Sequence, residues 1–570
     1  MADVVFVTPN IGGAMVEESL GTLQLATILQ EKGISCELLP FFKIGDVDDF
    51  EHFIENALSL LQQRKCRIVS FYTRCDSYHI VLRIAQRLKE RCKEMYTVFG
   101  GPQSDIVSEE TVRQLPFVDF VCCGEGETTI YPFFRSLLSG TPDLSVPGLV
   151  YREGDQVRKN PRPALLEDLD SLPMVDYSLL GPMEGEGDHP MSIDVGRGCP
   201  FGCTFCSTKS FWGRKYRLKS PQRICDEVKL YHQRCGGSLV EFAHDMFTMN
   251  RAKVIETCRL LKQLDFPLKW CCSARLDCVD EELINIMADA GMISIYFGIE
   301  TGSPRMQKLI HKNLDLESAQ KLVEYTASKG VYVTTSFIYG FPEETEEDLS
   351  MTMDLMSRIM RTPKAKVHAH LCAFMAGTEL SRRYREELTP TQVYSDQTGE
   401  HAVEACKDLI LGYPELFQHM LEYKTPLRTA LRHFALFFRV WTQLRPVYQY
   451  FLTKYPANRL IDLYYDFVEA NQEVLEYVYD MKANWSTVLI QKDRLWEKFK
   501  DDENIERIRD LYRFAQMESS AEQRRDSVQM FGIDPEEAQE KDLRDCQPCV
   551  CVITWKHGRK QKVKYPYRQA

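Results

Sequence analysis

The amino-acid sequence predicts an α/β protein with an N-terminal Rossmann-like domain, a partial (β/α)6 barrel and a mainly helical C-terminal domain. Three observations support this prediction. Short apolar runs alternate with amphipathic helical patterns over residues 1–145, strand-and-helix units follow within residues 191–385, and aromatic helical patterns dominate residues 386–545. A proline-rich segment, residues 146–190, is expected to link the first two domains, and residues 546–570 are expected to form a tail.

The N-terminal domain is predicted to contain a parallel, doubly wound sheet. Its strands are expected at Val4–Thr8, Arg67–Tyr72, Tyr96–Phe99 and Asp119–Cys122. Its helices are expected at Ser19–Lys32, Tyr78–Glu94 and Glu127–Ser139. The ligand of such a sheet lies beyond the carboxyl ends of the strands, where this sequence has glycine-rich loops.

The barrel is predicted from strand candidates that each precede a helical stretch. They are Ser192–Val195, Ser238–Phe242, Leu268–Ser273, Ile293–Ile299, Tyr332–Ile338 and Lys366–Ala373. Barrels of this kind place their chemistry at the carboxyl ends of the strands. Beyond residue 380 helical patterns are expected at Pro414–Trp441, Val447–Leu452 and Arg459–Val478.

Three cysteines with the spacing CxxxCxxC follow the first barrel strand. Cys199, Cys203 and Cys206 can bind three irons of a cubane cluster and leave the fourth iron open. The glycines at positions 196, 198 and 202 let this loop wrap tightly around an inorganic core. A closed zinc site is the alternative, but it needs a fourth ligand, and no second cysteine pair lies nearby in the sequence.

On this motif the chain resembles the radical S-adenosylmethionine enzymes. The resemblance implies a 4Fe–4S cluster on the three cysteines, whose open iron binds S-adenosylmethionine and passes one electron to it, which releases a 5′-deoxyadenosyl radical. It also implies S-adenosylmethionine contacts at Phe205, Asp245, Ser273, Arg275, Glu300, Gly340, Phe341 and Pro342. Asp245 is the candidate for the amino group, with His244 in place of an acidic residue of the family pattern. A helix-capping role is the alternative for Asp245.

The loops of the N-terminal domain resemble those of the cobalamin-binding domain found in many radical S-adenosylmethionine enzymes. The candidate cobalamin contacts are Gly12, Gly13, Thr73, Gly100, Gly101, Pro102, Gln103, Gly124, Glu125 and Gly126. The DxHxxG segment by which methionine-synthase-type domains give a histidine to cobalt is absent from the sequence. Radical members of the class commonly bind cobalamin without it. A Rossmann-like domain that no longer binds a corrin is the alternative.

The resemblance therefore implies a cobalamin-dependent radical enzyme that methylates an unactivated carbon of a peptide or secondary metabolite. It implies a one-electron reductant such as flavodoxin or ferredoxin as partner. A radical cyclase, a ring-rearranging enzyme or a sulfur-inserting enzyme with the same cofactors is the second hypothesis. A cluster-bearing sensor without enzymatic activity is the third.

Charge and composition exclude several other classes. The net charge of −12 argues against a general nucleic-acid-binding protein, since phosphate contacts need a basic face. No stretch approaches the roughly eighteen uncharged apolar residues of a membrane span. The segment from Met1 to Pro9 lacks the basic and apolar regions of a signal peptide. We therefore expect a cytoplasmic protein whose 20 cysteines are reduced.

The tail combines cysteines with basic residues. Cys546, Cys549 and Cys551 form a CxxCxC group, which is typical of an auxiliary iron–sulfur or zinc site but also arises by chance. The run of Lys and Arg from Lys556 to Arg568 is expected to be solvated and partly disordered, with docking to an acidic partner as the alternative.

Overall fold

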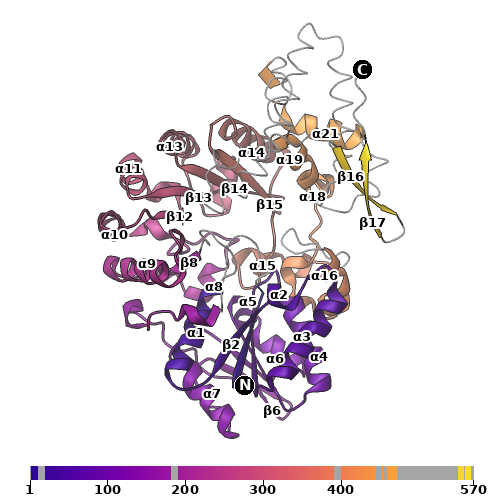
Figure 1. Cartoon of the computed structure of the whole chain (residues 1–570). Coiled ribbons are helices and arrows are strands. Elements are labelled where there is room, and N and C mark those ends of the chain that lie inside the picture. The colour runs from indigo at the N-terminus through magenta and orange to yellow at the C-terminus, as the bar shows by residue number, and fades with distance from the viewer. Residues whose placement is uncertain are drawn as a thin grey trace. The chain divides into compact units, whose positions relative to one another are not determined.

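The computed structural model describes residues 2–9, 19–180, 191–389, 400–443, 448, 452–453, 459–470, 550–556 and 559–565 (Figure 1). The chain forms two compact units. Unit 1 comprises Met1–Ile299, Gln307–Thr335 and Cys372–Lys424, and unit 2 comprises Glu300–Met306, Ser336–Leu371 and Thr425–Ala570.

The N-terminal part of unit 1 is a seven-stranded sheet with the order β2-β1-β3-β4-β5-β6-β7. The strands are β1 (Val4–Thr8), β2 (Cys36–Pro40), β3 (Ile68–Tyr72), β4 (Tyr96–Gly100), β5 (Phe120–Cys122), β6 (Leu149–Glu153) and β7 (Gln156–Lys159). The first five strands pair in parallel, with Val4 opposite Cys36 and Ile68, and β6 and β7 pair antiparallel. This confirms the predicted Rossmann-like sheet.

Helices surround this sheet and bury its strands. They are α1 (Leu20–Glu31), α2 (Phe41–Ile44), α3 (Phe50–Arg64), α4 (Tyr78–Arg91), α5 (Pro102–Ile106), α6 (Ser108–Gln114) and α7 (Ile130–Ser139). All five residues of β1 are buried, as expected for a parallel strand covered on both faces. The expected proline-rich linker is only partly a linker, because its residues 149–159 form the β6–β7 hairpin and extend the sheet.

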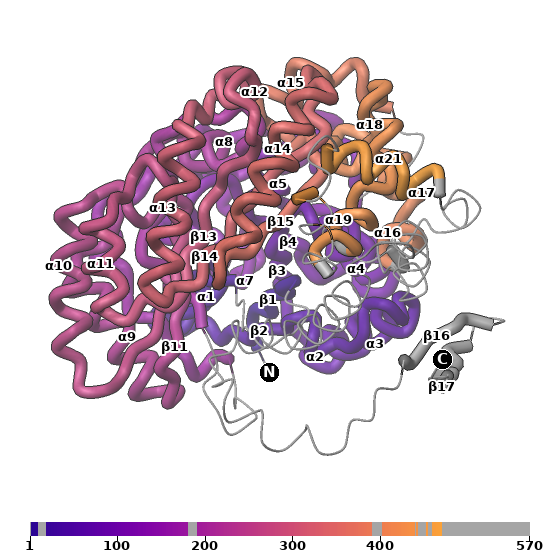
Figure 2. The backbone as a smooth tube through the Cα atoms, turned by 90° about the horizontal axis from the view of Figure 1, so that it is seen from above, coloured from indigo at the N-terminus to yellow at the C-terminus, as the bar shows by residue number. Residues whose placement is uncertain are grey.

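A segment from much later in the chain completes the core of this sheet domain. Helices α16 (Glu400–Ala405) and α17 (Lys407–Gly412) and the turns Pro414–Leu416 and Gln418–Met420 follow one another there. Figures 1 and 2 both show α16 beside α3. Phe417 is fully buried, and its ring centroid lies 5.7 Å from that of Tyr78 in α4. These residues were expected in a C-terminal helical domain, yet they pack in the N-terminal core.

The barrel sheet has the order β15-β14-β13-β12-β11-β8, which confirms the predicted partial barrel. Its strands are β8 (Met191–Asp194), β11 (Leu239–Ala243), β12 (Lys269–Ala274), β13 (Met292–Glu300), β14 (Tyr332–Tyr339) and β15 (Ala365–Leu371). The pairs β8–β11, β11–β12 and β12–β13 are parallel. The helices include α9 (Pro221–Cys235), α10 (Arg251–Leu261), α11 (Glu281–Asp289), α13 (Leu316–Ser328) and α14 (Glu346–Ile359).

Unit 2 gathers the later helices around α14 and β15. They are α18 (Pro426–Ala430), α19 (Phe434–Gln443) and α21 (Leu460–Ala470). Aromatic rings hold them together, with the centroid of Phe437 5.4 Å from that of Tyr464. The stretch expected as helical from Pro414 to Trp441 is therefore several short helices and turns.

The tail contains a hairpin of β16 (Val550–Lys556) and β17 (Arg559–Tyr565), with Val550 opposite Tyr565. Strand β17 lies within the basic run that was expected to be solvated and partly disordered. Cys546 and Cys549 lie outside the described residues, and only the backbone of Cys551 is described.

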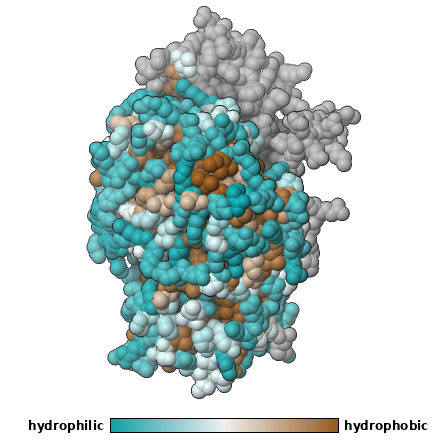
Figure 3. Space-filling model, turned by 90° about the vertical axis from the view of Figure 1, so that its left-hand side faces the viewer, coloured by the Kyte–Doolittle hydropathy of each residue, from teal (hydrophilic) through white to brown (hydrophobic). Residues whose placement is uncertain are grey.

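On the face shown in Figure 3, hydrophilic residues are interspersed with hydrophobic ones. The large hydrophobic side chains that are exposed include Phe42 and Met249. No helix among the described residues is both long and apolar enough to cross a membrane.

Candidate cluster and cofactor site

The three cysteines lie on the loop that leaves β8, where none of them forms a disulfide and all three are half-buried. The loop is fixed by backbone hydrogen bonds, from Cys206 N to Cys203 O at 3.2 Å and from Thr204 N to Ile310 O at 3.1 Å. Gly198 has a φ of 86°, and a Cβ there would lie 1.9 Å from the carbonyl oxygen of Lys215. Only glycine fits this position, so the turn before Cys199 depends on Gly198.

The donor set of this loop fits an iron–sulfur cluster. Cys203 and Cys206 line a cavity of about 180 Å³, together with Lys209 and Arg382. Burial raises the pKa of the Cys199 thiol, and a metal that bound there would displace its proton. Among the described residues, no three His, Cys, Asp or Glu converge on one metal ion. A cubane cluster does not need three ligands that converge on one metal ion, because each cysteine binds a separate iron.

Asp245 lies next to the cysteine loop, just after β11. Its Oδ2 accepts a hydrogen bond of 2.9 Å from Gly198 N, and its Oδ1 accepts one of 3.2 Å from Thr208 Oγ1. Asp245 therefore supports the turn before Cys199. The preceding His244 is buried, and its Nδ1 accepts from Met246 N at 2.7 Å. The carboxylate of Asp245 is the acceptor that an ammonium group would need.

Arg275 follows β12 and reaches the same loop. Its Nη1 lies 3.7 Å from Cys203 Sγ, and its guanidinium lies 3.9 Å from the ring centroid of Phe201. Asp277 and the carbonyl oxygen of Lys312 accept its other N–H groups at 2.7–2.8 Å. Arg275 is thus a buried cation held beside a cluster ligand, where a substrate carboxylate can pair with it.

The other predicted contacts of unit 1 belong to the same elements. Ser273 lies two residues before Arg275 in β12 and is half-buried. Phe205 directly precedes Cys206 and is also half-buried. Phe205 and Asp245 thus both lie at the cysteine loop.

The remaining predicted contacts belong to unit 2. Glu300 ends β13 with a φ of 72°, and Gly340 follows β14 with a φ of 77°. The Gly340 carbonyl accepts a hydrogen bond of 2.5 Å from Arg428 Nη1. Phe341 is 1% exposed, and Pro342 is half-buried. Glu300 and Gly340 thus both have a positive φ where their strands end.

Sequence reasoning missed Glu344 on the turn after β14. Its Oε2 accepts a hydrogen bond of 2.5 Å from Gly340 N, and burial raises its pKa to about 8. Its Oε1 is buried without a hydrogen-bond partner among the described residues. A carboxyl that is protonated at neutral pH can donate a hydrogen bond there. The glycine-flanked turn, followed by two acidic residues, was the available signal.

The predicted cobalamin contacts Thr73, Gly101 and Pro102 form a rigid turn where β3 and β4 end. Thr73 is buried and donates a hydrogen bond of 2.9 Å from Oγ1 to Gly100 O. Gly101 has a φ of 99°, and a Cβ there would lie 2.8 Å from Thr73 O. Pro102 begins α5.

Two further observations at this edge bear on a bound corrin. The hydroxyl of Thr8, the last residue of β1, and that of Ser77, which directly precedes α4, are buried without a partner among the described residues. Such hydroxyls suit a polar ligand at this edge. Gln103 is less available for a contact with a corrin, because its Nε2 donates a hydrogen bond of 2.8 Å to Leu416 O. Gly12 and Gly13 lie outside the described residues.

The third loop of this edge follows β5. Gly124 has a φ of 82°, and its N–H donates to Asp105 Oδ2 at 2.9 Å. Both carboxylate oxygens of Glu125 accept hydrogen bonds from the protein itself, from Arg197, Arg217 and the Leu166 N–H. Glu125, which the sequence analysis named as a candidate corrin contact, thus has several partners within the protein. A Cβ at Gly126 would lie 3.2 Å from Leu25 Cδ2.

Unit 1 brings the loops of the two predicted cofactors together. Helix α5, which begins after Gly101, packs against α8 (Thr208–Trp212), which begins two residues after Cys206. A Cβ at Gly377 would lie 2.8 Å from Ile106 Cγ2 and 3.0 Å from Ser210 Oγ. The cluster loop and the carboxyl edge of the N-terminal sheet are thus neighbours.

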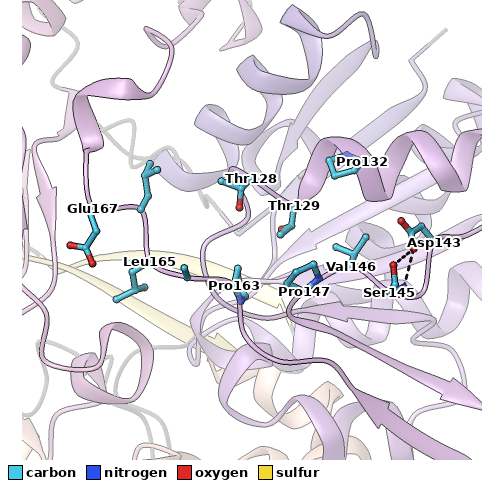
Figure 4. A pocket seen from close by; sticks show the side chains of 12 residues that line it. Thr128, Thr129, Pro132, Asp143, Ser145, Val146, Pro147, Pro163, Leu165 and Glu167 are labelled. Carbon is cyan, nitrogen blue, oxygen red and sulfur yellow. Dashed lines mark hydrogen bonds between the residues drawn. The ribbon is translucent and has the colours of Figure 1, made fainter.

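A second cavity, of about 520 Å³, lies beside the start of α7 (Figure 4). Its walls come from the N-terminal turn of α7, from residues 143–147 and from residues 163–167. None of the predicted site residues lines this cavity.

Comparisons with known proteins agree with this arrangement. Residues 193–356 match the radical SAM superfamily, and residues 13–132 match the B12 binding domain. The two matches support S-adenosylmethionine with a 4Fe–4S cluster and cobalamin as cofactors.

Two curated relatives and one solved structure illustrate the similarity. An uncharacterized methyltransferase of Pyrococcus horikoshii is 32% identical over 50% of this chain and 61% of its own length. The anaerobic magnesium-protoporphyrin IX monomethyl ester cyclase of Rubrivivax gelatinosus is 27% identical over 47% of this chain and 50% of its own length. The chain thus spans about half to three fifths of these relatives.

The solved structure is the cobalamin-dependent S-adenosylmethionine radical enzyme OxsB with aqua-cobalamin and S-adenosylmethionine bound. Its TM-score is 0.59 at 14% identity, over 94% of this chain and 82% of that one. At this identity the likeness concerns the fold, and it agrees with the two sheets described above.

Proposed function

Because the chain belongs to the cobalamin-binding radical S-adenosylmethionine enzymes, we propose that it methylates an unactivated carbon of a peptide or another small metabolite. The observation that carries this proposal is the contact between the two cofactor loops within unit 1. A methyl transfer that uses both cofactors needs their sites side by side.

In this proposal, residues of the chain bind and orient the cluster and S-adenosylmethionine and shield them from water. When bound, the cluster and S-adenosylmethionine supply the radical, and cobalamin supplies the methyl group. Cys199, Cys203 and Cys206 hold the cluster. Asp245 accepts hydrogen bonds from the amino group of S-adenosylmethionine, and Arg275 pairs with its carboxylate. Each has a second contact that keeps it in place, to Gly198 N and to Asp277 respectively.

We propose that Phe205 and Ser273 also line the S-adenosylmethionine site within unit 1. The candidate contacts of unit 2 are Glu300 and the turn Gly340–Pro342. Glu300 has a φ of 72°, and non-glycine residues held in this strained region cluster at ligand sites, which supports a ligand-binding role for Glu300.

The reductant in this proposal is an acidic one-electron carrier such as flavodoxin or ferredoxin. Lys209 and Arg382 line the cavity beside Cys203 and Cys206, and both are exposed. Positive charge near the cluster favours the approach of an acidic protein.

The test uses the full chain, purified without oxygen and reconstituted with iron, sulfide and hydroxocobalamin. Metabolite extracts are incubated with the protein and S-adenosylmethionine that carries a labelled methyl group. We expect a product that gains the labelled methyl, with S-adenosylhomocysteine and 5′-deoxyadenosine formed in about equal amounts. A protein that retains cluster and corrin yet forms no methylated product would overturn the proposal.

A radical cyclase is the second candidate, because the Rubrivivax gelatinosus relative is described as a cyclase. The same incubation separates the two. A cyclase forms 5′-deoxyadenosine without S-adenosylhomocysteine, and its product gains no methyl mass.

A further inference from the structure

Four charged side chains form a buried ion network between the β5 loop and the cluster loop. Glu125 lies between Arg197 Nη1 at 2.7 Å and Arg217 Nη1 at 2.8 Å, and Glu127 accepts from Arg197 Nη2 at 2.6 Å. None of the four side chains is more than 7% exposed. Arg197 also contacts Asp194 at 3.2 Å.

The two arginines of this network differ in the number of carboxylates that they contact. Arg197 contacts three carboxylates, whereas Glu125 is the only carboxylate that Arg217 contacts among the described residues. Arg217 also donates from Nη1 to Leu166 O at 2.6 Å, but its Nε and Nη2 are buried without a partner there. Removal of the Glu125 charge would therefore leave Arg217 as an uncompensated buried cation, which is strongly unfavourable.

Glu125 is ionised in this environment. Burial raises the pKa of its carboxyl, but the hydrogen bonds from Arg217, Arg197 and the Leu166 N–H outweigh burial and hold the pKa below its usual range. The indole of Trp212 in α8 packs against both cations, with ring-to-guanidinium distances of 5.7 Å for Arg197 and 5.5 Å for Arg217. Such a network has one favourable arrangement, so it resists small displacements.

The network touches both cofactor loops directly. On one side, Glu125 stands between Gly124 and Gly126 at the carboxyl end of β5. On the other side, Arg197 precedes Gly198, whose N–H donates to Asp245, and Cys199 follows. One carboxylate thus joins the loop predicted to meet the corrin to the loop that holds the cluster.

We propose that Glu125 is a positioning residue that fixes the corrin-side loop against the cluster loop, so that radical formation and methyl transfer stay coupled. This inference rests on the proposed function for its catalytic consequence, while its structural consequence is independent of the substrate. Misplacement of reacting groups by about 1 Å is enough to slow a reaction on the order of a hundredfold. Loss of Glu125 therefore affects the coupling of the two steps more than either cofactor's binding.

The test compares Glu125→Gln with the wild type, both as full chains loaded with cluster and hydroxocobalamin. We expect unchanged iron and corrin contents. Pulsed electron paramagnetic resonance measures the distance between the reduced cluster and cob(II)alamin, and we expect a narrow distribution in the wild type and a broad one in the variant. The ratio of methylated product to 5′-deoxyadenosine should fall at least about tenfold.

Glu167→Gln is the matched control. Glu167 follows Leu166, whose N–H donates to Glu125, and it pairs with Lys215 at 2.7 Å. The side chains of Glu167 and Lys215 are 69% and 57% exposed. An exposed pair is worth little, so this variant should behave as wild type. A second comparison uses Arg217→Gln and the double variant that combines Glu125→Gln with Arg217→Gln. If Glu125 and Arg217 act as a unit, the double variant should show no broader a distance distribution and no lower a product ratio than either single variant.

The outcomes separate this inference from the proposed function. A narrow cluster-to-cobalt distribution in Glu125→Gln, equal to that of the wild type, overturns the inference even if methylation is observed. A wild type that methylates nothing overturns the proposed function, while the distance measurement still tests Glu125. If Glu125→Gln does not fold, as judged by circular dichroism, Arg217→Lys is measured in the same way, since it keeps the charge but shortens the reach.

Discussion

The carboxylate of Asp245 accepts a hydrogen bond of 2.9 Å from the backbone N–H of Gly198, directly before the first cluster cysteine. The residue that we assign to the amino group of S-adenosylmethionine therefore also shapes the turn that presents Cys199. A single carboxylate with two oxygens can serve both purposes, because each oxygen accepts more than one hydrogen bond. Ligand binding and loop geometry are thus linked at one side chain.

Replacement of Asp245 by Asn should separate these two roles. The amide oxygen of Asn can still accept from Gly198 N, so the cluster content should stay near that of the wild type. The lost charge should weaken S-adenosylmethionine binding and lower 5′-deoxyadenosine formation about 10- to 100-fold. The spectral change of the reduced cluster on addition of S-adenosylmethionine reports the binding. Asp265→Asn, at an exposed position, is the control.

Each cluster cysteine should be essential on its own. Cys199→Ala, Cys203→Ala or Cys206→Ala should abolish the 4Fe–4S signal and the cleavage of S-adenosylmethionine, because a three-sulfur site has no spare ligand. Iron content, visible absorbance and 5′-deoxyadenosine are measured after anaerobic reconstitution. Cys235→Ala, at the end of α9, should behave as wild type. Full turnover in any of the three cluster variants would contradict the assignment.

The local pattern of the chain predicted most strands of both sheets, because buried parallel strands are short apolar runs. Arg67–Tyr72 was expected and Ile68–Tyr72 is observed, and the barrel strands agree as closely. The hairpin β6–β7 was missed because prolines surround it, and β2 was not singled out. Pairing with a sheet edge, which local sequence does not encode, makes these segments strands.

Features that depend on contacts between residues far apart in the sequence could not be predicted from local sequence patterns. Glu125 was expected to contact a corrin, because its loop resembles that of the cobalamin-binding domain. Its contacts with Arg197 and Arg217, which lie 72 and 92 residues later, could not be predicted from the sequence. The aromatic and apolar residues near Phe417 were equally compatible with a separate helical domain. Only tertiary packing assigns them to the N-terminal core.

Two buried histidines should make unit 1 sensitive to acid. Burial lowers the pKa of His79 to about 3 and that of His419 to about 4, and both ring nitrogens of His79 lack a partner among the described residues. An unfolded histidine titrates near pH 6.5, so the unfolded state binds more protons below that pH. Stability should therefore fall as the pH drops from about 7, by about 2 kcal/mol per histidine at pH 5.

The variant His79→Phe tests this prediction by removing one titrating group. Melting temperatures of the wild type and the variant are compared at several pH values between 7.5 and 5. The wild type should lose stability over this range, and the variant should lose less of it. A variant with the same pH dependence as the wild type would show that His79 does not contribute. His52→Phe, in the exposed part of α3, serves as the control.

The packing of Phe417 against Tyr78 predicts that the N-terminal domain depends on a segment from beyond the barrel. Phe417→Ala removes a fully buried ring from the core that α3 and α4 share with residues 400–420, so the free energy of unfolding should fall by about 3–5 kcal/mol. Phe42→Ala, at a side chain that is 44% exposed, should have little effect. Chemical denaturation and limited proteolysis of the full chain measure both variants, and early cleavage within residues 19–140 is expected only for Phe417→Ala. An unchanged unfolding midpoint in Phe417→Ala would mean that the N-terminal domain is stable without this segment.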